Sequence, residues 1–166
     1  MQKYNIALLP NTKSKELIEL AQQFSKSADI YLLGENSLPH VTLYQFWKKE
    51  AVIEQIWLKV NSVWKFSACM LNFSNVSYFS RDNKIFYISL LPDEISILQK
   101  MHALIAQTLH LPVKVNFDPH ITLFNTNEAS LNLDILKSQS FHIKDHFTLR
   151  LGSCDEVGQF TKILSY

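Results

Sequence analysis

The sequence contains few of the residues that mark linkers, disulfide scaffolds and metal sites. Its 3 glycines and 5 prolines among 166 residues leave little room for flexible or low-complexity segments. Its 2 cysteines, Cys69 and Cys154, are too few for a disulfide framework or a zinc site. We expect both to be reduced and buried as small apolar side chains.

A long apolar run is also missing at the start of the chain. Residues 1–10 hold only a short apolar stretch before Pro10. That stretch is too short for a signal peptide or a membrane span. We therefore expect a cytoplasmic protein that makes no membrane contact.

An excess of charge of either sign is absent as well, since the formal net charge is +1. Proteins that hold long nucleic acid through its phosphates usually carry a strong basic excess or a dense basic patch, and neither is visible here. A nucleotide or a short RNA end is therefore a better partner than a long duplex. Hydrophobic residues make up 47% of the chain, which is enough for the core of one compact domain.

Hydrophobic periodicity divides the chain into strands and helices. Strands are expected over residues 4–9, 40–47, 66–79, 84–91, 120–124, 141–151 and 157–164. Helices are expected over residues 12–27, 50–63, 93 to about 109, and 128–138. Residues 111–118 form a connection or a short strand. Each half of the chain therefore alternates strands with helices.

Two segments of the first half recur in the second half, in the same order. Residues 6–10 (IALLP) match residues 88–92 (ISLLP), and residues 39–43 (PHVTL) match residues 119–123 (PHITL). The offsets of 82 and 80 residues are nearly equal, which chance rarely produces. We therefore expect a single domain of two repeat halves, about 1–80 and 81–166, packed about a pseudo-twofold axis. The repeat does not show which strands share a sheet.

Both copies of the second segment place a histidine and a threonine two residues apart on a strand. Side chains at that spacing point to the same face of a sheet. His40 and Thr42 therefore share one face, as do His120 and Thr122. The apolar residues between them suit the core. The duplication thus predicts one cleft lined by two imidazoles and two hydroxyls.

Two aromatic residues follow the motifs at the same spacing. Tyr44 and Phe124 continue the faces of the motif residues, so they could stack a nucleobase in the cleft. Ordinary packing is an equally good interpretation of both. Four basic residues could attract phosphate, although a solvated surface explains them better: Lys48, Lys49, Arg81 and Lys84.

The expected cleft suits phosphodiester chemistry. A neutral imidazole can take a proton from an attacking water, and an imidazolium can give a proton to the leaving oxygen. Histidine does both near neutral pH because its ordinary pKa lies near 6.5. The threonine hydroxyls can donate hydrogen bonds to the phosphate oxygens. No metal or other cofactor is required, and the sequence has no tight cluster of carboxylates to hold a metal ion.

A single His-x-Thr motif is weak evidence, because a strand histidine is usually satisfied by a local hydrogen bond. The pair is stronger evidence, because both copies occupy the same frame of the repeat and both follow a proline. His142 and His146 are four residues apart on an expected strand, about 13 Å, which is too far for one metal ion. His102 and His110 lie on the helix around Met101, where surface or helix-end roles suit them better than metal binding.

The chain resembles the 2H phosphoesterase superfamily in its two His-x-Thr motifs and in its N-terminal Ile-Ala-Leu-Leu-Pro strand with the helix that follows. It is similar to the small bacterial members known as 2′-5′ RNA ligase or RNA 2′,3′-cyclic phosphodiesterase. The resemblance spans almost the whole chain. It implies a bilobal duplicated α+β fold, with two antiparallel sheets lining a central cleft and helices on the outside. It also implies that His40 and Thr42 form the first catalytic pair and His120 and Thr122 the second, with His120 as base and His40 as acid. The near-symmetry of the motifs does not itself assign these two roles.

The resemblance implies a metal-independent phosphodiesterase that acts on 2′,3′-cyclic phosphate or 2′-5′ linkages of nucleotides or short RNA. We expect a monomer without cofactors. Many RNA-processing members have a basic residue just after the second motif, where this chain has Phe124 and Asn125. Two alternatives therefore stay open: a non-catalytic RNA- or nucleotide-binding module of the same fold, and a phosphodiesterase with a non-RNA substrate. The presence of both histidines and both threonines favours an enzyme.

Overall fold

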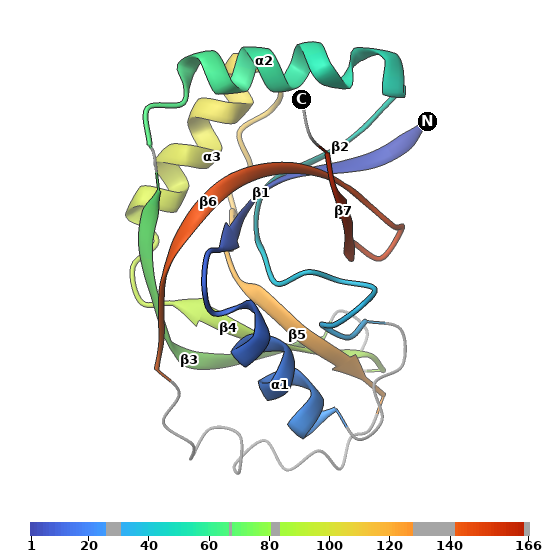
Figure 1. Cartoon of the computed structure of the whole chain (residues 1–166), viewed down its shortest axis with the longest axis vertical. Coiled ribbons are helices and arrows are strands. Elements are labelled where there is room, and N and C mark those ends of the chain that lie inside the picture. Colours follow the sequence, from blue (N-terminus) through green and yellow to red (C-terminus); the bar gives the residue numbers. More distant parts are fainter. Residues whose placement is uncertain (26–30, 67, 81–83, 128–141, 165–166) are drawn as a thin grey trace.

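The computed structural model describes residues 1–25, 31–66, 68–80, 84–127 and 142–164 (Figure 1). Its strands are β1 (Gln2–Pro10), β2 (Val41–Lys48), β3 (Cys69–Ser80), β4 (Phe86–Pro92), β5 (Ile121–Thr126), β6 (Ile143–Cys154) and β7 (Phe160–Ile163). Its helices are α1 (Ser14–Phe24), the 3-10 helix η1 (Glu50–Val52), α2 (Ile53–Val63) and α3 (Ser96–Thr108). The helix expected over residues 128–138 lies outside the described residues.

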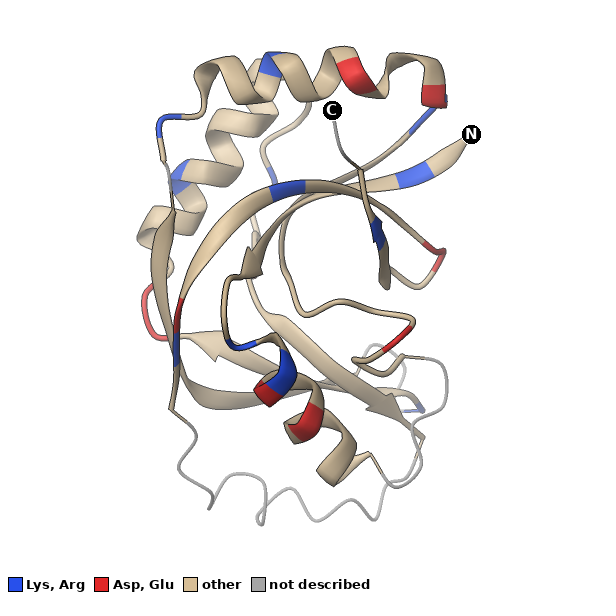
Figure 2. Ribbon diagram, in the orientation of Figure 1, with Lys and Arg blue, Asp and Glu red and all other residues tan. Residues whose placement is uncertain are grey.

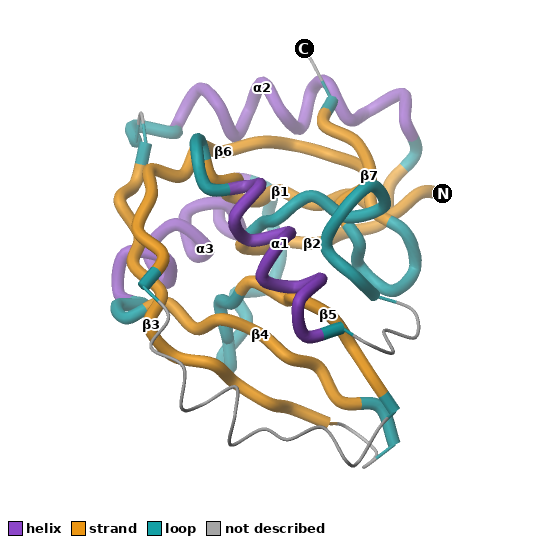
Figure 3. Tube along the Cα trace, turned by 60° about the horizontal axis from the view of Figure 1, so that its bottom comes forward, coloured by secondary structure: helices purple, strands orange, loops and turns teal. Residues whose placement is uncertain are grey.

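The seven described strands form one antiparallel sheet, in the order β2-β1-β6-β3-β4-β5, with β7 beside β6. The α+β class is therefore confirmed, whereas the expected division into two sheets is wrong. The reason is β6, a long curved strand that pairs with β1 over residues 147–154 and with β3 over residues 143–147 (Figure 1). It connects the two groups of strands that Figure 3 separates, β1, β2 and β7 on one side and β3, β4 and β5 on the other.

The two repeats exchange their last strands. The first two strands of each repeat are neighbours, because β1 pairs with β2 and β4 pairs with β5. The third strand of each repeat pairs with the first strand of the other: β3 with β4, and β6 with β1. The helices cross over as well, since α1 packs against β5 and α3 packs against β2. Each group of strands is therefore built from both halves of the chain.

A β-bulge occurs at the same place in both repeats. Neighbouring positions of β1 oppose Thr42 and Tyr44, so Leu43 has no opposite residue. In the β4–β5 pair, Leu123 is left out in the same way. An extra residue reverses the alternation of faces along a strand. The two bulges occupy matching places in the two motif strands, and they change which side chains reach each face.

The helices cover the sheet with their apolar faces. Leu17 and Ala21 of α1 are fully buried, four residues apart as a helical stripe requires. On the strands, Val41 and Ile121 are 0% exposed in the same core. Burial of a side chain of this size contributes about 1.5–3 kcal/mol. These two residues directly follow the motif histidines, so their burial directs the motif side chains to the opposite face.

The surface of the described residues carries both signs of charge. Figure 2 shows that lysine, arginine, aspartate and glutamate positions are spread along the ribbon. Both cysteines are free and buried, as the sequence predicts. No described helix has the length and apolar composition needed to cross a bilayer.

Candidate active site

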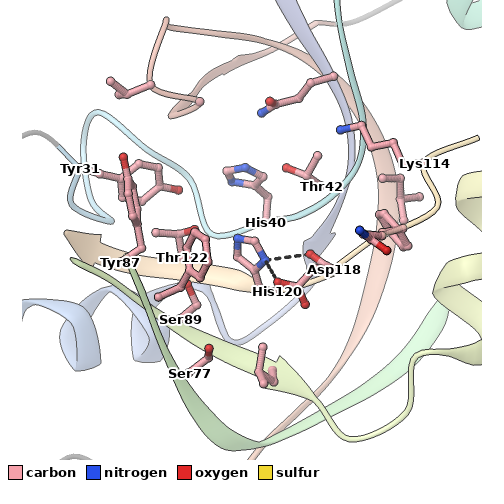
Figure 4. A pocket seen from close by; sticks show the side chains of 18 of the residues that line it. Tyr31, His40, Thr42, Ser77, Tyr87, Ser89, Lys114, Asp118, His120 and Thr122 are labelled. Carbon is pink, nitrogen blue, oxygen red and sulfur yellow. Dashed lines mark hydrogen bonds and ion pairs between the residues drawn. The ribbon is translucent and has the colours of Figure 1, made fainter. Parts of the chain in front are cut away.

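A cleft of about 870 Å³ is lined by all four motif residues (Figure 4). His40 and Thr42 reach it from the start of β2. His120 and Thr122 reach it from the start of β5, the equivalent strand of the second repeat. The structure therefore brings two imidazoles and two hydroxyls into one space, from segments 80 residues apart in the sequence.

The two histidine rings are held in the same way. Nδ1 of His40 lies 2.7 Å from the carbonyl oxygen of Leu38, and Nδ1 of His120 lies 2.9 Å from that of Asp118. A carbonyl oxygen only accepts hydrogen bonds, so Nδ1 is the donor in each ring. In a neutral ring Nε2 is then unprotonated and can accept a proton. Figure 4 shows the two rings beside each other in the same part of the cleft.

His40 is almost completely buried, with 5% of its surface exposed. The ring of Phe160 lies against it, at 5.2 Å between ring centroids. Burial lowers the pKa of His40 to about 4, because a charged ring would lose its hydration. The hydrogen bond to Leu38 acts in the opposite direction, and nearby His120 adds to the lowering. His40 is therefore a neutral imidazole at neutral pH.

Phe160 can cover His40 because a glycine lies beneath its ring. Gly152 of β6 has no side chain, and a Cβ added there would overlap the Phe160 ring. Phe160 is itself 0% exposed and packs with Ala7 and Leu9 of β1. The first half of the cleft is thus closed over its histidine by a residue of β7.

His120 has different surroundings, since its side chain is 39% exposed. Oδ2 of Asp118 lies 3.7 Å from its Nδ1. Leu38, which occupies the equivalent position before His40, has no charge. The carboxylate therefore offers a charged partner to a protonated ring in the second motif alone.

The two motif hydroxyls also differ. Nδ2 of Asn5 donates a hydrogen bond of 2.9 Å to Oγ1 of Thr42. Asn5 lies on the neighbouring strand β1 and is 0% exposed. Because the Thr42 oxygen is the acceptor in that bond, its own proton stays available to a ligand. Within the described residues, no hydrogen bond fixes the Thr122 hydroxyl.

Tyr44 and Phe124 do not line the cleft, so the expectation that they share the face of the motif residues is wrong. The matched bulges reverse the alternation just before them, and both residues turn toward the core. Phe124 is 1% exposed. Tyr44 stacks on the ring of His102, at 5.3 Å between centroids. The structure therefore supports packing, the second interpretation of these residues.

His102 is buried, so the expected surface or helix-end role is also wrong. Its ring is stacked between Tyr44 and Phe117, at centroid distances of 5.3 and 4.3 Å. Its Nδ1 donates to the carbonyl of Leu43 at 2.7 Å, and its Nε2 accepts from the backbone N–H of Lys114 at 3.0 Å. His102 thereby joins the bulge of the first motif to the loop that leads to the second.

The two ends of the cleft differ in chemistry (Figure 4). The end built by β3 and β4 carries Phe79 and Tyr87, and Figure 4 shows Tyr87 on the Thr122 side. The end nearer β1 and β2 carries Lys3 and Lys114. Glu156 also lines the cleft, and its backbone carbonyl accepts a hydrogen bond from Lys3, so this end carries charges of both signs.

Sequence reasoning did not single out Phe79 and Tyr87. They lie directly opposite each other in the β3–β4 pair. The alternation that puts them on one face is visible in each strand, but their position beside Thr122 depends on β4 lying between β3 and β5. That order follows from the strand exchange, for which the sequence carries no direct signal.

Other residues considered from the sequence stay outside the cleft. Five of these residues are exposed and do not line the cleft: Lys48, Lys49, Lys84, His142 and His146. Arg81 lies outside the described residues. In the part of the chain that the structure describes, no three His, Cys, Asp or Glu side chains gather in a group that could hold a metal ion.

Two solved structures have the same fold over nearly their full length. The crystal structure of E. coli LigT, complexed with NADP+, matches with a TM-score of 0.63 at 16% sequence identity, covering 99% of this chain and 95% of LigT. The structure of Kluyveromyces marxianus Usb1 matches with a TM-score of 0.55 at 10% identity, covering 98% of this chain and 95% of Usb1. At these identities the two matches show that the chain shares the fold of LigT and Usb1 over nearly its whole length. No protein-family model and no curated protein sequence matches the chain.

Proposed function

We propose that the protein is a 2H-type phosphodiesterase that opens 2′,3′-cyclic phosphates, or cleaves 2′-5′ linkages, in nucleotides or short RNA ends. One observation carries this proposal. Each motif histidine is anchored through Nδ1 to a backbone carbonyl, beside a threonine hydroxyl, and both line the same cleft. Anchoring at Nδ1 leaves both Nε2 atoms for proton transfer, and the chemistry requires no metal.

The difference in burial supports His40 as the base. A buried ring with a pKa of about 4 is neutral at neutral pH, so its Nε2 can take the proton of an attacking water. The water oxygen forms a new bond to phosphorus as it loses that proton. This assignment reverses the one implied by the family resemblance, in which His40 is the acid.

The surroundings of His120 support its role as the acid. Its ring is open to solvent and lies beside the Asp118 carboxylate, which suits an imidazolium. From Nε2 it gives a proton to the ester oxygen as the phosphorus–oxygen bond breaks. A cyclic phosphate thereby opens to a phosphomonoester, and both histidines return to their starting states when they exchange protons with water.

Thr42 and Thr122 support the phosphate between the two rings. Their hydroxyls can donate to the non-bridging oxygens, where negative charge increases in the transition state. The bond from Asn5 supports this role for Thr42, because it occupies the Thr42 oxygen as an acceptor and leaves the proton for the phosphate.

The test is a turnover assay of the purified protein on a defined panel. The panel contains 2′,3′-cyclic nucleotides, 2′-5′ dinucleotides and oligonucleotides that end in a cyclic phosphate. We expect turnover of at least one class, in excess EDTA as well as without it, and its loss in the double variant His40→Ala/His120→Ala. Loss of turnover in EDTA that metal restores would overturn the metal-free mechanism. Nucleotide binding without any turnover would identify a non-catalytic binding module instead.

A further inference from the structure

Phe79 and Tyr87 form an aromatic wall at one end of the cleft. The two residues are directly opposite each other on β3 and β4, so their side chains share one face of the sheet. Both line the cleft, and Phe79 is 57% exposed. A large apolar ring exposed inside a polar cleft suits contact with a ligand better than it suits contact with water.

The next pair of aromatic residues on the same two strands behaves differently. Tyr78 and Phe86 stack on each other with 4.7 Å between centroids and 9° between planes. Tyr78 precedes Phe79 directly, so it points to the opposite face of β3. Within the described residues, no aromatic ring stacks on Phe79 or on Tyr87. The wall inside the cleft is therefore the pair that lacks a ring partner.

In the first half of the molecule, an aromatic ring occupies the place that is equivalent to the space over Phe79. Asn5 corresponds to Tyr87 by the offset of 82 residues, and Asn5 opposes Gly152 as Tyr87 opposes Phe79. Over Gly152 lies the ring of Phe160, which also contacts His40. In the second half no described residue covers Phe79 in this way, and His120 is open. One half of the cleft thus contains its own aromatic ring, and the other has a place for one.

We propose that the Phe79–Tyr87 wall is a stacking subsite for the nucleobase of the substrate. This proposal rests on the proposed function, because it assumes a nucleotide whose phosphate lies between the two histidines. An aromatic wall accepts any base, since every base has a π face. The substrate class is therefore a nucleotide with its base on the Thr122 side of the reacting phosphate.

The spacing between the wall and the reacting phosphate fits a ribose. Ser89 of β4 opposes Thr122 on one side and Ser77 of β3 on the other. Ser77 and Ser89 line the cleft two residues from the wall, a step of about 7 Å along a strand. Their hydroxyls lie where the sugar of a base stacked on the wall would pass on its way to the phosphate.

The experiment compares a substrate with a base and one without. Adenosine 2′,3′-cyclic phosphate and ribose 2′,3′-cyclic phosphate are assayed with the parent protein and with Phe79→Ala. Stacking on an aromatic ring is typically worth about a fivefold to hundredfold change in affinity. We expect Phe79→Ala to raise KM for the adenosine substrate by that factor, with kcat unchanged. We expect KM for the base-free substrate to stay the same.

Two further variants separate stacking from a general structural effect. Phe79→Trp should restore the parent KM, because tryptophan also stacks. Tyr78→Ala is the matched control, since Tyr78 is the adjacent exposed aromatic residue on the opposite face, 39% exposed. Binding of adenosine 2′-monophosphate, followed by calorimetry, provides a readout that does not depend on turnover.

The outcomes distinguish the subsite from the proposed function. If the parent hydrolyses both substrates and Phe79→Ala changes neither KM, the subsite is wrong and the phosphodiesterase stands. If nothing is hydrolysed but Phe79→Ala weakens adenosine 2′-monophosphate binding, the subsite stands and the enzyme does not. An equal loss in Tyr78→Ala, or the absence of both turnover and binding, overturns the subsite.

Discussion

Each half of the sheet carries a His-x-Thr motif with the same local backbone geometry, but the residues around the two histidines differ. Both histidines donate from Nδ1 to the carbonyl two residues earlier, and a bulge follows each motif threonine. In the first half Phe160 covers His40, whereas in the second half His120 is open and has Asp118 beside it. The repeat thus provides matching geometry, and changes in the neighbouring residues make one ring suited to accept a proton and the other to give one.

The difference extends beyond the histidines. The equivalent positions Asn5 and Tyr87 are, respectively, a buried amide bonded to its motif threonine and an aromatic residue that lines the cleft. One half has therefore become a covered, internally bonded site. The other has kept an open face suited to a ligand, which is how a duplicated site can lose its symmetry without losing its geometry.

Removal of either histidine ring should have the largest effect and is the strongest test of the comparison between the two halves. We expect His40→Ala and His120→Ala each to lower kcat by ~10²–10⁴, because proton transfer by a positioned group is worth that much. The double variant should lose far less than the product of the two, since the rings act as a unit. His142→Ala and His146→Ala are the controls, because both residues are exposed outside the cleft lining. Parent-level turnover by the double variant would place the chemistry elsewhere.

The pH dependence of kcat/KM tests the assignment of the base. His40 must be neutral to accept a proton, so activity is present above its pKa and falls as the pH drops below about 4. We expect a bell-shaped profile whose acid limb lies well below the ordinary histidine pKa of about 6.5. In Phe160→Leu, which leaves more space for water beside the ring, that limb should move to higher pH. A parent acid limb near pH 6.5 would contradict the burial of His40.

Protein stability should show the same lowered pKa. The unfolded chain binds a proton at the ordinary histidine pKa of about 6.5, and the folded chain does so only near about 4. The unfolded state therefore gains protons first as the pH falls, and the free energy of unfolding decreases over that window. Denaturation in urea at several pH values measures this slope. His40→Gln should show a shallower slope between pH values of about 6.5 and 4, and an unchanged slope would be evidence against a depressed pKa.

The two threonines should separate activity from stability. Thr42→Val leaves Nδ2 of the buried Asn5 without its partner, which costs about 1–3 kcal/mol of unfolding free energy. Thr122→Val breaks no hydrogen bond within the described residues, so its stability should stay within about 0.5 kcal/mol of the parent. Both should lower turnover, because each loses a phosphate hydrogen bond. Equal denaturation midpoints for the two variants would show that the hydrogen bond from Asn5 to Thr42 does not contribute to the free energy of unfolding.

Asp118→Asn should give the smallest effect. It removes the carboxylate near His120 and keeps the backbone carbonyl that holds the ring. A protonated His120 then loses a charged partner, so we expect kcat/KM to fall. Exposed ion pairs are worth about 0.2–1 kcal/mol, which corresponds to a change in kcat/KM of about fivefold or less. Glu156→Gln, at another carboxylate of the cleft lining, is the control and should leave kcat/KM unchanged.

The positions of the motifs and of most helices and strands could be predicted from the sequence because both depend on local patterns. The equal offsets placed His40 and His120 in one frame, and alternation predicted that Val41 and Ile121 would face the core. The helix around Met101 was visible from its apolar spacing, and it appears as α3. These signals lie within a few residues of one another, so they can be recognised without knowledge of the tertiary structure.

The features that escaped sequence reasoning depend on contacts between distant segments. Nothing near Leu43 or Leu123 signals a bulge, and one extra residue was enough to turn Tyr44 and Phe124 away from the cleft. His102 is buried because two aromatic rings from other segments stack on it. The single sheet results from β6 pairing with strands of both groups, a choice of partners that strand patterns do not encode.

Because the third strands are exchanged, neither half of the chain forms a complete group of strands by itself. One copy of the repeat alone would pair β1 with β2 and leave its third strand unpaired. A second copy would let the third strand of each copy pair with the first strand of the other. That is the arrangement of a domain-swapped dimer, with the two subunits joined here into one chain. Each His-x-Thr motif thus stands on a strand pair that is completed by a strand of the other half, so the position of each motif depends on both halves.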